Sequence, residues 1–370
     1  MLIYVLYFLF LTILAIQYQF TPFRNNYVLL TVTVFLILLA GFRDIDVSKD
    51  YIIYQYLFDT VYYMTEYNGD SSSILNGFLA FEPGFVGIVL LFRSFIETNY
   101  GVTIMLFYAL TSLSIKAYAI NRLSINPYLS LLFYFSYFFL VQEMTQIRIG
   151  LASALFFISL ISFINGKRGV FIGLIVLASL FHYSAIFYLV ILLFDTKTFN
   201  RNFYIVLIIL SLVLGFLKLP LLNLLGNNFD ASDVSVKFDS YIQRSESGDI
   251  PINVFNSLNI LNILCCFYFL VFIKHDALLR DKRLIVFLKC NILSIFLLSF
   301  LSGAPAFAFR FSELFSVAEI FLFTYLVNFL PAKKYNVFIG VLIAGFFFYV
   351  MEIHGNLLEP YKIIHINAFN

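Results

Sequence analysis

Charged residues are scarce in this chain of 370 residues, where Asp, Glu, Lys and Arg together make up 12%. An ordinary soluble domain carries about 25% of these residues, whereas here hydrophobic residues reach 62%. Apolar segments of roughly 17 to 25 residues recur along the chain, and each is long enough to cross the ~30 Å hydrocarbon core of a bilayer. Because an open sheet cannot satisfy its backbone hydrogen bonds in lipid, we expect an all-α, polytopic integral membrane protein.

Other features are also missing. The formal net charge is only +2 and there is no basic run, so no nucleic-acid partner is expected. The 3 cysteines show no CxxC or Cys/His spacing, which predicts buried thiols and no metal site. Tryptophan is absent, but 48 Phe and 25 Tyr suit interfacial belts and lipid contact. No repeat or Pro-rich linker divides the chain, so residues 1–370 are predicted to form a single membrane domain.

Apolar segments predict the membrane spans, and the first lacks the basic start and the cleavage site of a signal peptide. The plainest are residues 2–20, 27–42, 100–121, 127–145, 147–165, 203–219, 253–273, 284–301, 309–330 and 335–351. Positive residues in short loops mark the cytoplasmic side. All basic turns fall there only if residues 169–194 cross the membrane and return. We therefore predict two short helices that turn at His182, and about 10 to 12 membrane segments in total, including short or broken ones.

Two long polar connections share the outer face in this topology, together with the amino terminus. They are residues 43–99 and 220–252. A long connection with little regularity is usually functional in a compact protein. The first one also contains an amphipathic stretch at 82–97, with Pro83 at a helix start.

Ionisable residues at the ends of spans are costly, so each needs a reason. Arg148 either snorkels to the interface or belongs to a polar cluster with Gln142, Glu143 and Gln146, which precede it. A lone histidine such as His182 is often a hydrogen-bonded structural residue.

Arg310 has Glu313 one helical turn later, which allows a structural ion pair. Tyr51 and Tyr54 flank a carboxylate region at helical spacing, where anchoring at the interface is an alternative to a binding role.

Snorkelling, structural ion pairs and interface anchoring do not fully account for several cations and carboxylates, which are predicted near one face of the membrane. They are Arg43, Arg148, His182, Arg310, Asp44, Asp46, Asp50 and Glu82. Arginine binds phosphate through two parallel hydrogen bonds and keeps its charge in poor solvent. The pattern therefore predicts a diphosphate held beside an acid/base group. A phosphate-cradling Gly-rich loop, a GxSxG elbow and an HExxH motif are all absent from the sequence.

At these positions the chain resembles the Wzy-type polysaccharide polymerases, particularly the EpsG-like group. The resemblance lies in an ordered series of short motifs over roughly residues 40 to 320. They are Phe42-Arg43, Asp50-Tyr51-Ile52-Ile53-Tyr54, Glu82-Pro83-Gly84-Phe85, Arg148-Ile149-Gly150-Leu151-Ala152, Phe181-His182 with Ser184, and Arg310 with Glu313. The chain departs from the family pattern at Ser48-Lys49, where Gly-x is frequent, and at Ile149, where Gln is common.

The resemblance implies a glycosyltransferase of the bacterial inner membrane, similar in architecture to the GT-C class. Such enzymes join oligosaccharide repeat units carried on undecaprenyl diphosphate into an O-antigen or exopolysaccharide at the periplasmic face. The substrates are then lipid-linked oligosaccharides in the bilayer, and a polysaccharide chain-length regulator is a further partner that the sequence leaves open.

Roles for the site residues follow from this resemblance and from their chemistry. Arg43, Arg148 and Arg310 are expected to bind the diphosphate. Asp50 is the preferred general base, with Asp44 and Glu82 as competitors. His182 is expected to contact a phosphate, with proton transfer as the alternative. The residues assigned to the glycan are Tyr51, Tyr54 and Glu313. Because arginines can stabilise a diphosphate leaving group, no metal or other cofactor is expected.

Alternative functions remain at this point. An O-antigen ligase uses similar donors and arginines but transfers the chain to lipid A. A flippase or transporter lines a path through the bilayer with polar groups and often has an inverted repeat. Here the polar residues gather at one face and no repeat is evident, which favours the polymerase. A purely structural role gives no reason for arginines at membrane depth.

Overall fold

The computed structural model describes residues 1–22, 25–66, 81–96, 99–217, 253–332 and 334–364, and these ranges contain helices and no β-strand. The outer-face connection predicted at 220–252 lies outside the described residues. The chain divides into two compact units, Met1–Ile186 with Val327–Asn370, and Phe187–Leu326. The single membrane domain expected for residues 1–370 stays a prediction.

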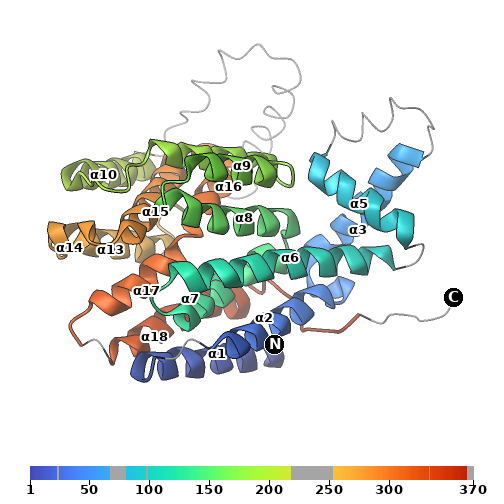
Figure 1. Ribbon diagram of the computed structural model, residues 1–370, viewed down its shortest axis with the longest axis horizontal. Coiled ribbons are helices and arrows are strands. Elements are labelled where there is room, and N and C mark those ends of the chain that lie inside the picture. Colours follow the sequence, from blue (N-terminus) through green and yellow to red (C-terminus); the bar gives the residue numbers. More distant parts are fainter. Residues whose placement is uncertain (23–24, 67–80, 97–98, 218–252, 333, 365–370) are drawn as a thin grey trace, which may run out of the picture. The chain divides into compact units, whose positions relative to one another are not determined.

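The first unit carries helices from both ends of the chain (Figure 1). These are α1 (Leu2–Phe20), α2 (Asn26–Gly41), η1 (Ile45–Val47), α3 (Lys49–Glu66), α5 (Pro83–Phe95), α6 (Tyr100–Leu123), α7 (Pro127–Tyr134), the π-helix η2 (Phe135–Glu143), α8 (Ile147–Ile164), α9 (Arg168–Ser179), α18 (Asn336–Phe348) and the π-helix η4 (Tyr349–His354). The 3-10 helix η3 (Tyr183–Leu193) begins in this unit.

The second unit is formed by helices of the later part of the chain. These are α10 (Arg201–Leu217), α13 (Ser257–Val271), α14 (His275–Leu279), α15 (Lys282–Phe300), α16 (Pro305–Ser316) and most of α17 (Glu319–Phe329).

Helix α8 is largely buried within the first unit and packs against α6 and α9, as Figure 1 also shows. Its small residues Gly150, Ala152, Ser153 and Ala154 are buried and let neighbouring backbones approach. A hypothetical Cβ at Gly150 would lie only 2.9 Å from the backbone oxygen of Gln142. The start of α8 is therefore fixed closely against the end of η2.

The fold confirms an all-α polytopic membrane protein. Five described helices are long and apolar enough to cross a membrane, or 6 if the bent pair Phe307–Ser316 and Glu319–Phe329 counts as one span. Shorter apolar helices of 10–17 residues accompany them, among them α2, α9 and α10. The total of about 10 to 12 membrane segments and the GT-C-like architecture stay predictions.

Two apolar segments are interrupted, and the sequence predicts only the first interruption. Helix α9 ends at Ser179 and η3 begins at Tyr183, so the chain is interrupted at His182 as expected. The span expected at 309–330 is instead bent by 49° between α16 and α17. At the end of α16, Ser316 Oγ donates to the Glu313 carbonyl at 3.2 Å.

The connection at 43–99 was expected to have little regular structure apart from an amphipathic stretch at 82–97 with a helix start at Pro83. The helix start at Pro83 is confirmed by α5, whereas the absence of regular structure before it is wrong because of α3. Helix α3 occupies Lys49–Glu66 and α5 occupies Pro83–Phe95. Tyr51, Tyr54, Phe58 and Val61 recur at intervals of three and four residues, which places them on one buried face of α3. The polar residues on its other faces hide this pattern from a search for apolar runs.

Candidate active site

The position of Glu82 is set by the start of helix α5. It immediately precedes Pro83, the first residue of that helix, where the missing N–H of proline costs nothing. The next residue, Gly84, donates its backbone N–H to the Leu180 carbonyl at 2.8 Å. A Cβ at Gly84 would stand 2.8 Å from that same oxygen, so only glycine permits this approach. The start of α5 is thus held at the end of α9, beside His182.

Arg148 and His182 meet at the Glu82 carboxylate. Arg148 Nη1 donates to Glu82 Oε2 at 2.5 Å, and His182 Nδ1 lies 3.5 Å from Glu82 Oε1. The side chains of Glu82, Arg148 and His182 are 10%, 24% and 21% exposed. Residues separated by 66 and 34 positions in the chain therefore form one half-buried charged cluster, which we call the Glu82 cluster.

Electrostatics keep the Glu82 carboxylate ionised. Burial alone raises the pKa of Glu82, but the contact with His182 and the positive charge of Arg148 more than offset this. The pKa of Glu82 consequently lies below its ordinary value of 4.5. At neutral pH the cluster holds an anion between two nitrogen-bearing partners.

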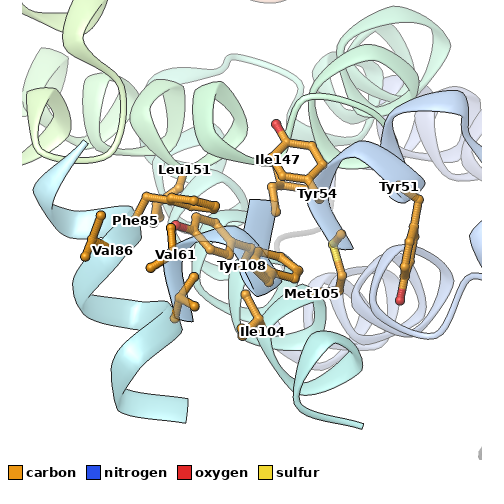
Figure 2. Close-up of a cluster of buried hydrophobic side chains, with 12 residues drawn as sticks. Tyr51, Tyr54, Val61, Phe85, Val86, Ile104, Met105, Tyr108, Ile147 and Leu151 are labelled. Carbon is orange, nitrogen blue, oxygen red and sulfur yellow. The ribbon is translucent and has the colours of Figure 1, made fainter. Parts of the chain in front are cut away.

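Aromatic rings form the wall behind Arg148. Its guanidinium carbon lies 5.2 Å from the centre of the Phe85 ring and 5.8 Å from that of Tyr54. Figure 2 shows the Phe85 ring near Leu151 and the Tyr54 ring near Ile147, within the buried cluster that joins α3, α5, α6 and α8. Rings in this position hold the planar guanidinium by cation–π contact and keep water from one side of it.

Asp50 lies one helical turn before Tyr54, in the first turn of α3. It is half-buried, and burial raises its pKa above the ordinary value of 3.8, with the charge of Arg43 opposing the shift. A carboxylate with a raised pKa is a better proton acceptor near neutral pH than an exposed one. The environment of Asp50 is therefore compatible with its expected role as general base, which stays a prediction.

Arg43 is enclosed by protein and is only 1% exposed. Its guanidinium donates to the Ala40 carbonyl and, at 3.7 Å, to the Met105 sulfur, and it lies 5.3 Å from the Tyr51 ring centre. In this arrangement almost none of the Arg43 side chain is exposed.

The segment near residue 363 covers Arg43 from outside. Residues 43 and 363 form an isolated antiparallel bridge. Asp44 donates its N–H to the Lys362 carbonyl at 2.9 Å, and Ile364 donates to the Phe42 carbonyl at 3.0 Å. Asp44 itself caps η1 by accepting from the Asp46 N–H at 3.3 Å. The predicted roles of Arg43 and Asp44 in substrate binding stay predictions.

The remaining predicted residues lie elsewhere or serve the core. Tyr51 and Tyr54 are 3% and 7% exposed and belong to the buried cluster of Figure 2, which leaves little of either ring for a glycan. Arg310 and Glu313 lie one turn apart on α16 in the second unit, with Arg310 exposed and Glu313 half-buried. Their roles also stay predictions.

Sequence reasoning missed Lys116, which lies inside the apolar helix α6 and is 1% exposed. Its Nζ is 2.5 Å from Glu143 Oε1, in a network that Gln142 and Ser153 extend toward α8. A lysine in the middle of an apolar span was the available signal, since a charge at that depth needs a partner.

Other places with the potential to bind ligands are separate from the Glu82 cluster. Within the described residues, no group of three or more His, Cys, Asp or Glu side chains is arranged to hold a metal ion. A groove of about 620 Å³ between α2 and α6 contains none of the predicted site residues. Its lining is Asn26, Leu29, Leu30, Thr33, Ser114, Ala117, Tyr118, Asn121 and Arg122.

The fold and the Glu82 cluster define a multi-pass membrane protein with a half-buried, charged site built from segments far apart in the sequence. Within that class, the chain belongs to the EpsG family, which matches residues 26–363. Membership of this family indicates a polysaccharide polymerase-like function. Neither a curated protein nor a solved structure matches the chain.

Proposed function

We propose that this protein is a glycosyltransferase that joins undecaprenyl-diphosphate-linked oligosaccharide repeat units into an O-antigen or exopolysaccharide. The reaction takes place at the periplasmic face of the bacterial inner membrane. The observation that carries the proposal is the Glu82 cluster, in which the ionic residues of three separate family motifs meet within 3.5 Å. The family match over residues 26–363 supports the reaction class.

Arg148 is the diphosphate ligand in this proposal. Its side chain is 24% exposed, so part of the guanidinium reaches solvent while Glu82 and the Phe85 ring hold its position. Arginine has five N–H donors in a planar fork, more than the carboxylate of Glu82 uses. A donor fixed before the substrate arrives stabilises charge that develops on a leaving group without costly reorganisation.

In the chemical step, a hydroxyl oxygen of the incoming repeat unit attacks the anomeric carbon of the growing chain. The bond between that carbon and the diphosphate oxygen breaks, and the diphosphate keeps the electron pair. Arg148 neutralises the added negative charge, and His182 contacts a phosphate oxygen. The hydroxyl proton passes to a carboxylate, for which Asp50 has the more suitable environment because its pKa is raised by burial.

Glu82 acts mainly as the residue that orients Arg148 and His182. Its contacts to both residues and its lowered pKa make it a weak proton acceptor at neutral pH. We therefore assign Glu82 a positioning role in preference to that of the base.

The proposal is tested with purified protein and a synthetic repeat unit on undecaprenyl diphosphate, with no other enzyme or acceptor. A polymerase produces a ladder of products that differ by one repeat unit. A ligase produces no ladder from repeat units alone, but transfers a single chain once lipid A core is added. A flippase changes the sidedness of the lipid in vesicles and forms no new glycosidic bond. Either of these two results overturns the proposal.

A further inference from the structure

A buried ionic network joins α6 to the segment that precedes α8. Lys116 Nζ and Glu143 Oε1 are 2.5 Å apart, and their side chains are 1% and 2% exposed. Glu143 Oε1 also accepts hydrogen bonds from Ser112 Oγ and from the Tyr134 hydroxyl, both at 2.7 Å. The carboxylate is thus held by one cation and two hydroxyl groups, all inside the protein.

The same network reaches both sides of Arg148 along the chain. Lys116 Nζ donates to Gln142 Oε1 at 3.2 Å, and that oxygen also accepts from Ser153 Oγ at 2.7 Å. Gln142 precedes Arg148 by six residues, and Ser153 follows it by five. The end of η2 and the second turn of α8 are therefore tied to one point on α6.

Packing leaves little freedom in the segment between these two attachments. A Cβ at Gly150 would lie 2.9 Å from the Gln142 backbone oxygen and 3.3 Å from Glu143 Oε2. The Gly150 N–H donates to the Gln146 carbonyl at 3.0 Å, which closes the first turn of α8. A shift of the network must consequently move the start of α8, and Arg148 with it.

Stabilisation of the fold alone does not explain why a buried ionic network is present. Removing two charges from water is expensive, and well-packed apolar residues of similar volume often give equal or greater stability than a buried ion pair. What an ionic network gives is a defined geometry, because its hydrogen bonds are satisfied in one arrangement only.

We propose that Lys116, Glu143 and Gln142 are positioning residues that fix the start of α8 and thereby aim the Arg148 guanidinium at the diphosphate. This inference rests on the proposed function for the identity of the ligand. The positioning itself concerns only the geometry of α8. A displacement of about 1 Å at a binding or reacting group is enough to lower a rate by roughly 100-fold.

The test replaces the ion pair by apolar residues of similar size, in the double variant Lys116→Met/Glu143→Leu. Because no charge is left without a partner, the double variant is expected to fold. Its Tm is expected to be lowered modestly, because the Ser112 and Tyr134 hydroxyl groups lose their acceptor. The single variant Lys116→Met leaves Glu143 buried without its cation and is expected to be less stable.

Two measurements follow in detergent micelles. The dissociation constant for undecaprenyl diphosphate is expected to rise by about 10- to 100-fold in the double variant. Hydrogen exchange of the amides at 147–152, measured without ligand, is expected to become faster than in the wild type, while exchange in α1 stays unchanged. Either wild-type affinity or wild-type exchange in the double variant overturns the inference.

Matched variants separate positioning from general damage. Ser153→Ala removes the hydrogen bond from Ser153 Oγ to Gln142 Oε1, together with a local one to the Gly150 carbonyl at 2.9 Å. It is expected to weaken diphosphate binding by a few-fold without loss of the fold. Lys289→Met removes another buried lysine, whose Nζ donates to the carbonyls of Asp195 and Thr198 in the second unit. We expect unchanged diphosphate affinity in this control, and a loss equal to that of the double variant contradicts the inference.

The outcome also distinguishes this inference from the proposed function. If the wild type does not bind undecaprenyl diphosphate, the proposed function fails, and hydrogen exchange at 147–152 still decides whether the network positions α8. If the wild type binds and exchange in the double variant is unchanged, only the positioning inference fails.

Discussion

The ion pair between Glu82 and Arg148 allows a quantitative test of the geometry of the site. The perturbation is a double-mutant cycle of Glu82→Ala, Arg148→Ala and the double variant. If the two side chains bind each other as in the structure, the double variant loses less stability than the sum of the single losses, because the second substitution removes a group that already lacks its partner.

The size of this coupling follows from the exposure of the two side chains. Exposed ion pairs contribute at most about 1 kcal/mol, whereas removal of one partner from a fully buried pair costs about 3–5 kcal/mol. With exposures of 10% and 24% and a separation of 2.5 Å, the Glu82–Arg148 pair falls between these limits. We therefore expect a coupling free energy of about 2 kcal/mol, which for a chain of this size corresponds to roughly 4 °C in Tm.

The assay is thermal unfolding followed by the helical circular dichroism signal in one detergent at one protein concentration. A control cycle uses the pair Asp46–Lys362, whose atoms are 3.4 Å apart and whose side chains are 68% and 62% exposed. Its coupling should be close to zero. Additive losses for Glu82 and Arg148, or a coupling no larger than that of the control pair, would refute the geometry described for the Glu82 cluster.

Further predictions concern titration and packing. The pKa of Glu82 in the folded protein lies below its ordinary value of 4.5, so its stabilising effect is complete above that pH and is lost as the pH falls further. The Tm difference between wild type and Glu82→Gln should therefore shrink as the pH falls below 4.5. A difference that grows on acidification contradicts the lowered pKa. Because burial raises the pKa of Asp50, its charge opposes folding at neutral pH, so Asp50→Asn should keep or raise the Tm while polymer yield is lost. A normal product ladder from this variant excludes Asp50 as the base. Gly150→Ala should lower stability by about 1–3 kcal/mol because its Cβ meets the Gln142 backbone oxygen at 2.9 Å, whereas Gly173→Ala on α9, with open space around it, should gain up to about 1 kcal/mol. Equal Tm shifts for the two alanine variants are incompatible with the close packing at the start of α8.

Much of the helical framework is predictable from apolar run length, since α1, α6, α8, α15 and the continuous pair α18 and η4 each contain a run of spanning length. The break at His182 is predictable too. The basic turns fit one side of the membrane only if the chain turns there, and α9 indeed ends at Ser179. The spans depend on local composition and the break depends on the order of the basic turns, and a single sequence displays both.

Features that depend on partners distant in the chain are harder to predict. The sequence identifies Glu82, Arg148 and His182 as ionisable residues whose position near the membrane requires an explanation. It does not predict that all three meet, because their meeting depends on the close approach of Gly84 to the Leu180 carbonyl. The burial of Arg43 and the isolated backbone bridge between residues 43 and 363 also join segments that are far apart in the sequence, so spacing alone does not predict them.

Helix α3 and the Lys116 network show a second kind of difficulty. Helix α3 mixes polar residues with its buried apolar face, so its average hydropathy is low compared with that of the spans. A search for spans by average hydropathy therefore passes over α3. Lys116 is a single charge within an apolar span, and its partner Glu143 lies on the next helix but one, beyond the reach of local spacing rules. Each of these features differs from the surrounding apolar spans in the sequence. The residues that they contact become evident only in the three-dimensional structure.

The most direct test of the account counts products in the reaction of the purified protein with a lipid-linked repeat unit. Each new glycosidic bond should release one undecaprenyl diphosphate, and both the ladder and the release should fall together by at least about 100-fold in Arg148→Gln. Gly173→Ala should match the wild type in both. Release of undecaprenyl diphosphate without chain growth, or an Arg148→Gln variant that extends chains at the wild-type rate, contradicts the central claim that Arg148 stabilises the diphosphate leaving group during polymerisation.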